Sequence, residues 1–113
     1  AIRGARERGA LCVCAAGNTG SVVTHPASVP EAVAVGAIGL EGWAHPTSVS
    51  ATRYPDELAR YGDDGYFVAN FSASGSAVRA VGPGVGILAP VVPDGAHSAP
   101  TGAMDGTSMA SPA

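Results

Sequence analysis

The sequence of 113 residues contains no lysine, few aromatic residues and little charge. Nine acidic and six basic residues leave a net charge of −3, and the basic residues are scattered arginines. Nucleic-acid-binding proteins carry a concentrated positive surface, so we expect no nucleic-acid partner. No apolar run approaches the length of a membrane-spanning helix, so we expect no membrane partner either. The arginines are Arg3, Arg6, Arg8, Arg53, Arg60 and Arg79.

Cysteine is also rare, and the two cysteines, Cys12 and Cys14, lie two positions apart in an apolar run. This spacing in a strand does not suit a disulfide bridge between them. Two cysteines alone do not make a zinc site. We therefore interpret both as small buried apolar residues.

Small apolar residues, mainly alanine, glycine and valine, are abundant. They suit buried strands and close contacts between helix and sheet, and they do not suit a disordered tail. A chain of this length can form one small domain with a modest core. Because it begins without Met or a leader and stops where a helix is expected to start, we expect a piece of a longer protein.

The first residues predict a helix, a tight turn and a strand. Residues 1–8 are typical of the last turns of a helix, with Gly9 following its end. The apolar run 10–16 predicts a strand buried on both faces, as in a parallel sheet. Further strands are predicted at 32–38 and 78–81, then a tight turn at 82–84 and a loop or hairpin over 89–103. This order indicates a layered α/β fold.

Asn18 follows the first predicted strand, within the segment Gly17-Asn18-Thr19-Gly20. Ligands of open α/β sheets bind just beyond the carboxyl ends of strands, so Asn18 is well placed for a site. An ordinary turn asparagine is the alternative, and on this segment alone it is the better one. A phosphate-binding loop is set aside because the sequence has neither GxGxxG nor a GK[ST] ending.

Residues 106–112 read GTSMASP near the C-terminal end. Gly106 removes steric bulk just before two hydroxyl residues, and the small residues that follow can start a helix. Such a turn holds the hydroxyl of Ser108 at a helix N-terminus, where developing negative charge is favoured. For the tripeptide GTS alone, a simple helix N-cap is the alternative.

The segment 106–112 closely resembles the nucleophile motif of subtilisin-like serine proteases. Residues 15–20, AAGNTG, resemble the oxyanion-hole segment of that family, and residues 24–37, THPASVPEAVAVGA, resemble its next loop and strand. The pair FS at 71–72 and the run GPGVGI at 82–87 also match. The resemblance implies an α/β fold, a partial subtilisin-like three-layer fold with a mostly parallel sheet, truncated at both ends.

By this resemblance Ser108 is the nucleophile, and the Asn18 side-chain amide with the Ser108 backbone N–H holds the oxyanion. The resemblance also implies that the substrate contacts two pocket walls and the cleft near the nucleophile. It further implies a cis peptide bond between His25 and Pro26. The first wall is Ala15, Ala16 and Gly17; the second is Thr24, His25, Pro26 and Ala27; Phe71, Gly106 and Thr107 lie along the cleft.

The general base and the orienting carboxylate of such a protease are missing. The family supplies them from an Asp-Thr/Ser-Gly strand end and a His-Gly-Thr-His helix start, both upstream of the matched segments. None of His25, His45 and His97 has that context, and we interpret Asp105 as a turn or capping residue. We therefore expect the isolated chain to be inactive, because a serine without its base loses most of its reactivity.

Residues 39–70 match the family least well, since the family crosses this interval in roughly a dozen residues. We expect an inserted flap with a short helix over 55–61. Candidate anchors of the flap are Trp43, Tyr66 and Phe67. Its acids lack calcium-loop spacing, so we interpret them as surface residues. These acids are Asp56, Glu57, Asp63 and Asp64.

The expected function is therefore that of a fragment of a serine endopeptidase. Its expected partners are a polypeptide substrate and the missing N-terminal part of the same catalytic domain. The resemblance implies secretion and no cofactor or metal in this chain, and it is compatible with calcium in the parent protein. One alternative is a non-catalytic peptide-binding module derived from the protease fold. Another is an unrelated small α/β ligand-binding domain in which 106–112 only starts a helix.

We also expect this piece alone to be poorly soluble or molten. A sheet cut through its middle exposes an apolar strand edge, and a helix cut at its start loses most of its packing.

Overall fold

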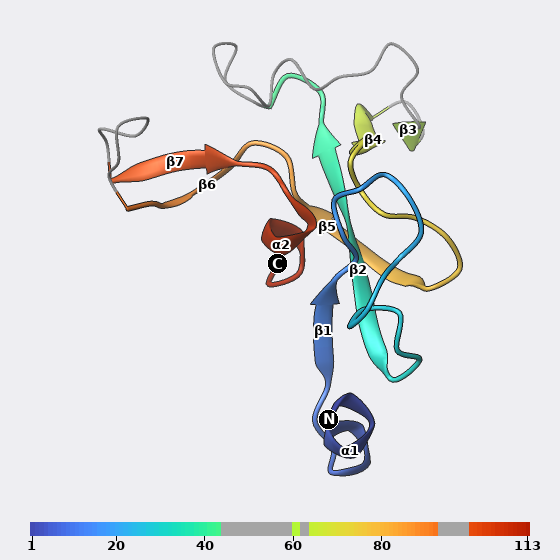
Figure 1. Cartoon of the computed structure of the whole chain (residues 1–113). Coiled ribbons are helices and arrows are strands. Elements are labelled where there is room, and N and C mark those ends of the chain that lie inside the picture. The colour runs from blue at the N-terminus through green and yellow to red at the C-terminus, as the bar shows by residue number, and fades with distance from the viewer. Residues whose placement is uncertain (44–59, 62–63, 93–99) are drawn as a thin grey trace.

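The computed structural model describes residues 1–43, 60–61, 64–92 and 100–113, whose arrangement is shown in Figure 1. Parallel and antiparallel strands combine with helices, which confirms the predicted α/β class. In chain order the elements are α1 (Ile2–Glu7), β1 (Cys12–Ala15), β2 (Ala32–Leu40), β3 (Arg60–Tyr61), β4 (Tyr66–Val68), β5 (Val78–Pro83), β6 (Ile87–Pro90), β7 (Thr101–Met104) and α2 (Thr107–Ala110).

Strand β2 is the centre of the main sheet. Strand β1 pairs with it in parallel over residues 32–35, and β5 pairs in parallel with residues 34–38 on the opposite edge. Strand β4 pairs antiparallel with residues 38–40. Ala34 and Ala37 of β2 have no exposed surface. A small apolar strand of this kind is expected where both faces of a parallel sheet are covered.

The two faces of β2 belong to two separate core clusters. Val35 and Ala37 face a cluster that includes Phe67 of β4 and Ala110 of α2. Ala34, which alternates with them, faces a second cluster. Ala16, Ala27 and Ala73 complete that second cluster. Because side chains alternate along a strand, β2 separates the layer of α2 from the layer formed by the loops around Ala27 and Ala73.

Two glycines bring α2 directly against the sheet. A Cβ atom at Gly82 would lie 2.6 Å from the Ala110 carbonyl oxygen. A Cβ atom at Gly84 would lie 2.6 Å from the Cβ atom of Ala37. Neither position has room for a side chain, so the small-residue composition sets the distance between α2 and the sheet.

Helix α1 and strand β1 form the N-terminal unit. The helix is slightly shorter than predicted, and Gly9 follows its end with a φ of 84°, as expected for a glycine at that position. Strand β1 was predicted to be buried on both faces, and this is wrong. Among the described strands β1 pairs only with β2, and Leu11 and Val13 are 55% and 46% exposed. The reason is that β1 is an edge strand of this sheet.

Both cysteines are free and half-buried. They pair with Ala32 and Ala34 of β2, and they therefore lie on the same face of the sheet. Cys14 packs against the second core cluster, as a small apolar residue does.

The ends of the interval 39–70 extend the main sheet. Strand β2 continues to Leu40, and β4 pairs with this extension. Phe67 is buried beneath Gly39, whereas Trp43 is 65% exposed and lines an apolar groove. The predicted helix over 55–61 is wrong at its end, because Arg60–Tyr61 pair with β4 as strand β3; residues 55–59 lie outside the described part.

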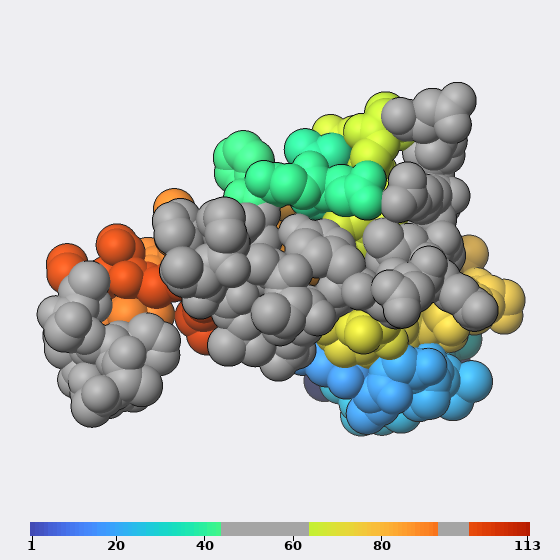
Figure 2. Space-filling model, turned by 90° about the horizontal axis from the view of Figure 1, so that it is seen from above, coloured from blue at the N-terminus to red at the C-terminus, as the bar shows by residue number. Residues whose placement is uncertain are grey.

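Strands β6 and β7 form the hairpin that was one of the two predictions for residues 89–103. It makes a sheet of its own and projects from the main sheet, as Figures 1 and 2 show. Leu88 and Val92 are 77% and 85% exposed. Neither described helix is long and apolar enough to cross a membrane.

Candidate functional site

Two segments that are distant in the sequence meet at Asn18 and Thr107. The backbone N–H of Thr107 donates to Asn18 Oδ1 at 2.9 Å, and the Thr107 hydroxyl donates to the same oxygen at 2.8 Å. The backbone N–H of Gly17 donates to Thr107 Oγ1 at 3.1 Å. We call these three hydrogen bonds the Asn18–Thr107 junction. The structure thus brings together the two segments that the sequence marked as one site.

The end of β1 sets the position of Asn18. The sheet continues one residue past the strand, since the Ala16 N–H donates to the Val35 carbonyl at 2.9 Å. Gly17 then turns the chain with a φ of 116°, and its carbonyl accepts a hydrogen bond from the Ala73 N–H at 2.8 Å. Asn18 therefore lies just beyond the carboxyl end of a parallel strand, where α/β folds place their ligands.

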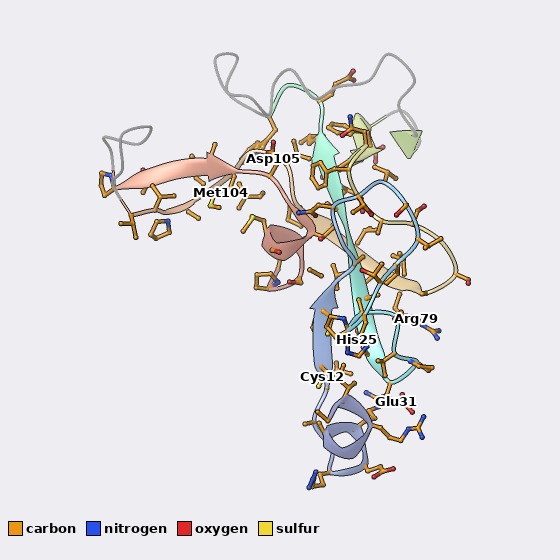
Figure 3. All side chains as sticks on the ribbon, in the orientation of Figure 1. Cys12, His25, Glu31, Arg79, Met104 and Asp105 are labelled. Carbon is orange, nitrogen blue, oxygen red and sulfur yellow. The ribbon has the colours of Figure 1, made fainter. Side chains whose placement is uncertain are left out.

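The turn into α2 is held by the residues that follow β5. The Gly106 N–H donates to the Gly84 carbonyl at 2.8 Å, and the Asp105 carboxylate accepts from the Gly86 N–H at 2.8 Å. Figure 3 shows Asp105 between the hairpin and α2. Asp105 is thus a turn residue, which was one of the two roles predicted for it. Helix α2 follows, with Thr107 buried and Ser108 exposed.

The junction fixes the orientation of the Asn18 amide. A backbone N–H can only donate, so the atom that faces Thr107 must be the oxygen Oδ1 and not the nitrogen Nδ2. The Nδ2 atom lies 3.2 Å from the point where a Cβ atom of Gly106 would stand. The backbone nitrogen of Ser108 lies 3.7 Å from the same point. The missing side chain of Gly106 therefore leaves a space bordered by two nitrogen donors and by Met109 Sδ, which lies 3.6 Å from the same point.

The two predicted pocket walls also approach each other. The peptide bond between His25 and Pro26 is cis, as predicted. A Cβ atom at Gly17 would lie 3.9 Å from Thr24 Oγ1. Ala16 of the first wall and Ala27 of the second are themselves buried in the second core cluster. Ala15 is the half-buried last residue of β1.

Sequence reasoning missed Ala73, which packs beside Gly17 of the first wall and belongs to the second core cluster. A Cβ atom at Gly17 would lie 3.6 Å from the Cβ atom of Ala73. Phe71, which was predicted to lie near the cleft, is half-buried, and its carbonyl accepts from the Gly20 N–H at 2.7 Å. Residues 71–74 thus run beside residues 17–22. Only the small size of Ala73 hinted at this role, and small residues are too common here to single one out.

His25 lies on the α1 side of the molecule. It lines a cavity of about 500 Å³ together with Arg3 and Glu31, and Figure 3 shows it close to Glu31. The Arg3 guanidinium donates to Glu31 Oε1 at 2.7 Å, and this bond holds the pKa of that carboxyl below its usual value of 4.5. His45 and His97 lie outside the described residues. Within the described residues, no three His, Cys, Asp or Glu side chains gather in a way that would hold a metal ion.

Two solved protease structures are similar to this chain. The chain is similar to the solved structure of the prenylagaramide maturation protease PagA, with 26% identity and a TM-score of 0.60 over 98% of its residues. It is similarly related to the self-cleaved protease domain of PatA, with 25% identity and a TM-score of 0.58 over 98% of its residues.

This chain spans 31% of the PagA chain and 32% of the PatA chain. No curated protein sequence matches it. The profile of the subtilase family matches residues 1–113, which is the whole sequence. The chain therefore belongs to the subtilase family.

Proposed function

We propose that this chain is the part of a serine endopeptidase that carries the nucleophile, Ser108, and the oxyanion donor, Asn18. Membership of the subtilase family supports a protease that acts on polypeptides. The observation that carries the finer assignment is the space beside Gly106. Asn18 Nδ2 and the Ser108 backbone nitrogen border it from two segments that the fold brings together.

In the proposed reaction, the Ser108 hydroxyl oxygen bonds to the substrate carbonyl carbon while its proton passes to a general base. The carbonyl oxygen becomes an oxyanion and enters the space beside Gly106, where it accepts from Asn18 Nδ2–H and the Ser108 N–H. The base then gives the proton to the leaving amine as the C–N bond breaks. Water hydrolyses the acyl-enzyme in the same way.

The general base and its carboxylate come, in this proposal, from a part of the protein outside residues 1–113. The two protease structures are about three times as long as this chain, and this length supports the proposal of such a part. His25 lines the cavity beside α1, and the Asp105 carboxylate bonds to Gly86. We propose neither residue as a member of the triad.

The pocket for the side chain before the scissile bond lies, in this proposal, between residues 15–17 and 24–27. The close approach of Gly17 and Thr24 supports this location. Both walls consist mainly of small residues, and the Thr24 hydroxyl lies 3.9 Å from the point where a Cβ atom of Gly17 would stand. We propose that Phe71 borders the cleft on the leaving-group side. From the family resemblance we also propose that the parent protein is secreted and that it binds calcium outside this chain.

A fluorophosphonate probe tests this function in the full-length protein. We expect one label per molecule, on the peptide that contains Ser108, and none in the Ser108→Ala variant. Asn18→Ala should slow peptide hydrolysis by roughly 10²–10³ in kcat, a range measured on subtilisin, a member of the same family.

The isolated 113-residue chain should not react with the probe, because it lacks the base. A full-length protein that binds peptides but neither reacts with the probe nor cleaves them would support the peptide-binding module instead. Labelling on a residue other than Ser108 would contradict the assignment of the nucleophile.

A further inference from the structure

An apolar groove of about 490 Å³ lies where the carboxyl end of β2 meets β4 and the start of β6. Val85 is buried and forms its floor, and Ile38 and Ile87 are half-buried beside it. Trp43 and Tyr66, which are 65% and 41% exposed, form the rim. Aromatic residues are few in this chain. Two exposed aromatic side chains at the edge of one groove are typical of a surface that binds a partner.

The groove adjoins the turn into α2. Val85 stands between the two residues that hold this turn. On one side of it, the Gly84 carbonyl accepts from the Gly106 N–H at 2.8 Å. On the other side, the Gly86 N–H donates to the Asp105 carboxylate at 2.8 Å. Figure 1 shows the start of β6 beside α2 and the carboxyl end of β2. One stretch of chain therefore supports the proposed nucleophile and lines the groove.

We propose that this groove binds an apolar side chain of the substrate on the leaving-group side of the scissile bond. Trp43 and Tyr66 are its specificity-determining residues. The inference rests on the proposed function, because it names a substrate preference for the same site. Both residues belong to the interval 39–70, which matches the family pattern least well, so the preference is one that the family resemblance does not supply.

The direction of the substrate follows from the order of the strands. The proposed pocket for the residue before the scissile bond lies at the end of β1, and the groove begins after β5. These two strands pair with opposite edges of β2. The turn into α2 contacts both of their ends, through the Gly17 N–H and the Gly84 carbonyl. A peptide that starts in the pocket and crosses this turn therefore continues toward the groove. Phe71, proposed to border the leaving-group side, packs against the same core cluster as Val85.

The lining of the groove selects an uncharged side chain. Ile38, Val85 and Ile87 offer apolar surface, and none of the described residues that line the groove is charged. A carboxylate that entered it would lose water without gaining a partner, whereas an apolar side chain gains by leaving water. The volume lies within the range of pockets that enclose small ligands, roughly 300–1,000 Å³. Leucine and phenylalanine side chains therefore fit, and aspartate is disfavoured.

A set of peptide substrates for the full-length protein tests this preference. The peptides differ only in carrying leucine or aspartate at one of the second to fifth positions after the scissile bond. At one of these positions we expect leucine to raise kcat/KM by roughly tenfold or more over aspartate. Trp43→Ala should reduce this preference to about threefold or less, because it removes the largest side chain of the rim. Trp43→Phe keeps an aromatic ring and should keep most of the preference.

Leu88→Ala is the matched control. This side chain is 77% exposed and follows Ile87 in the sequence, but it does not line the groove. Its removal should leave the preference for leucine within about twofold of the wild-type value. Labelling of Ser108 by the fluorophosphonate probe should be the same in the wild type, Trp43→Ala and Leu88→Ala, because the groove takes no part in that reaction.

Two results would overturn the inference and leave the proposed function in place. The first is a protein that takes the probe at Ser108 but shows no preference for leucine at these positions, or one that Trp43→Ala does not change. The second is a full-length structure in which the protein's own residues, from the same copy or a second one, fill the groove. If the wild type does not react with the probe at Ser108, the proposed function is wrong, and the inference falls with it.

Discussion

The Asn18–Thr107 junction and the β6–β7 hairpin are neighbours in the chain, yet they are built in opposite ways. At the junction, Gly106 and Thr107 are buried, and hydrogen bonds join segments about 90 positions apart. In the hairpin, Leu88 and Val92 are mostly exposed, and the two strands pair only with each other among the described strands. A two-stranded sheet alone is marginally stable in water.

The difference lies in where each region finds the partners of its side chains. The junction satisfies its polar groups with partners inside the described residues, so its geometry follows from the fold of the chain. The hairpin leaves its apolar side chains uncovered and is tied to the junction through Asp105 and Gly106. We therefore expect substitutions at the junction to change activity most, and substitutions at the connection to change local stability.

Gly106→Ala should have the largest effect. The added methyl group would lie 3.2 Å from Asn18 Nδ2 and 3.7 Å from the Ser108 nitrogen, within the proposed oxyanion space. We expect kcat of the full-length protein to fall by at least about 10², as when an oxyanion donor is lost. Gly4→Ala in α1 is the control, since its methyl would meet only the flexible end of Arg8. If the Gly106→Ala protein folds and its kcat stays within roughly threefold to fivefold of the wild-type value, the proposed location of the oxyanion space is contradicted.

Asp105→Ala should have an intermediate effect. It should lower the local stability of the connection between the two regions. It removes the acceptor of the Gly86 N–H, and an unpaired, part-buried donor costs about 1–3 kcal/mol. Hydrogen exchange at the Gly86 amide should therefore speed up by roughly tenfold or more. Asp105→Asn keeps an oxygen acceptor and should retain most of the protection. Equal exchange rates in the wild type and Asp105→Ala would show that this bond does not hold the base of the hairpin.

Arg3→Ala should have the smallest effect, because the Arg3–Glu31 pair lies outside both regions and its arginine is exposed. The bond lowers the folded pKa of Glu31, so its stabilisation is present above pH 4.5 and is lost as the pH falls through the lowered pKa. We expect Arg3→Ala to lower Tm slightly at pH 7, and by less as the pH falls below 4.5. Glu31→Gln should remove the same pH-dependent part. A Tm difference that is unchanged at pH 3 would contradict this account.

Local patterns in the sequence predicted much of the fold. The apolar run of β2 and the end of α1 at Gly9 each depend on residues that are close in the chain, whereas the cis peptide bond before Pro26 was predicted from the family resemblance. Such signals carry their own physical cause, whether hydrophobic periodicity or the backbone freedom of glycine. The pairing of Asn18 with Ser108 as one site came from resemblance to a family, since no local rule links residues 90 positions apart.

The sequence did not predict features that depend on neighbours in space. The exposure of Leu11 and Val13 reflects the edge position of β1, which no property of the strand itself reveals. Arg60–Tyr61 became a strand because β4 offered a partner, although the residues before them favour a helix. The bond from Gly86 to Asp105 and the role of Ala73 follow from tertiary contacts between common residue types. Thr107 was marked as part of the site, but its contact with Asn18 needed coordinates.

The most direct test of the account is a crystal structure of the full-length protein with a peptide aldehyde bound covalently to Ser108. The oxygen of the resulting hemiacetal stands where the oxyanion forms during catalysis. We predict that it accepts hydrogen bonds from Asn18 Nδ2 and from the Ser108 N–H in the space beside Gly106, while Asn18 Oδ1 keeps both bonds from Thr107. A hemiacetal oxygen that points away from Asn18, or an Asn18 amide turned with Oδ1 toward that oxygen, would contradict it.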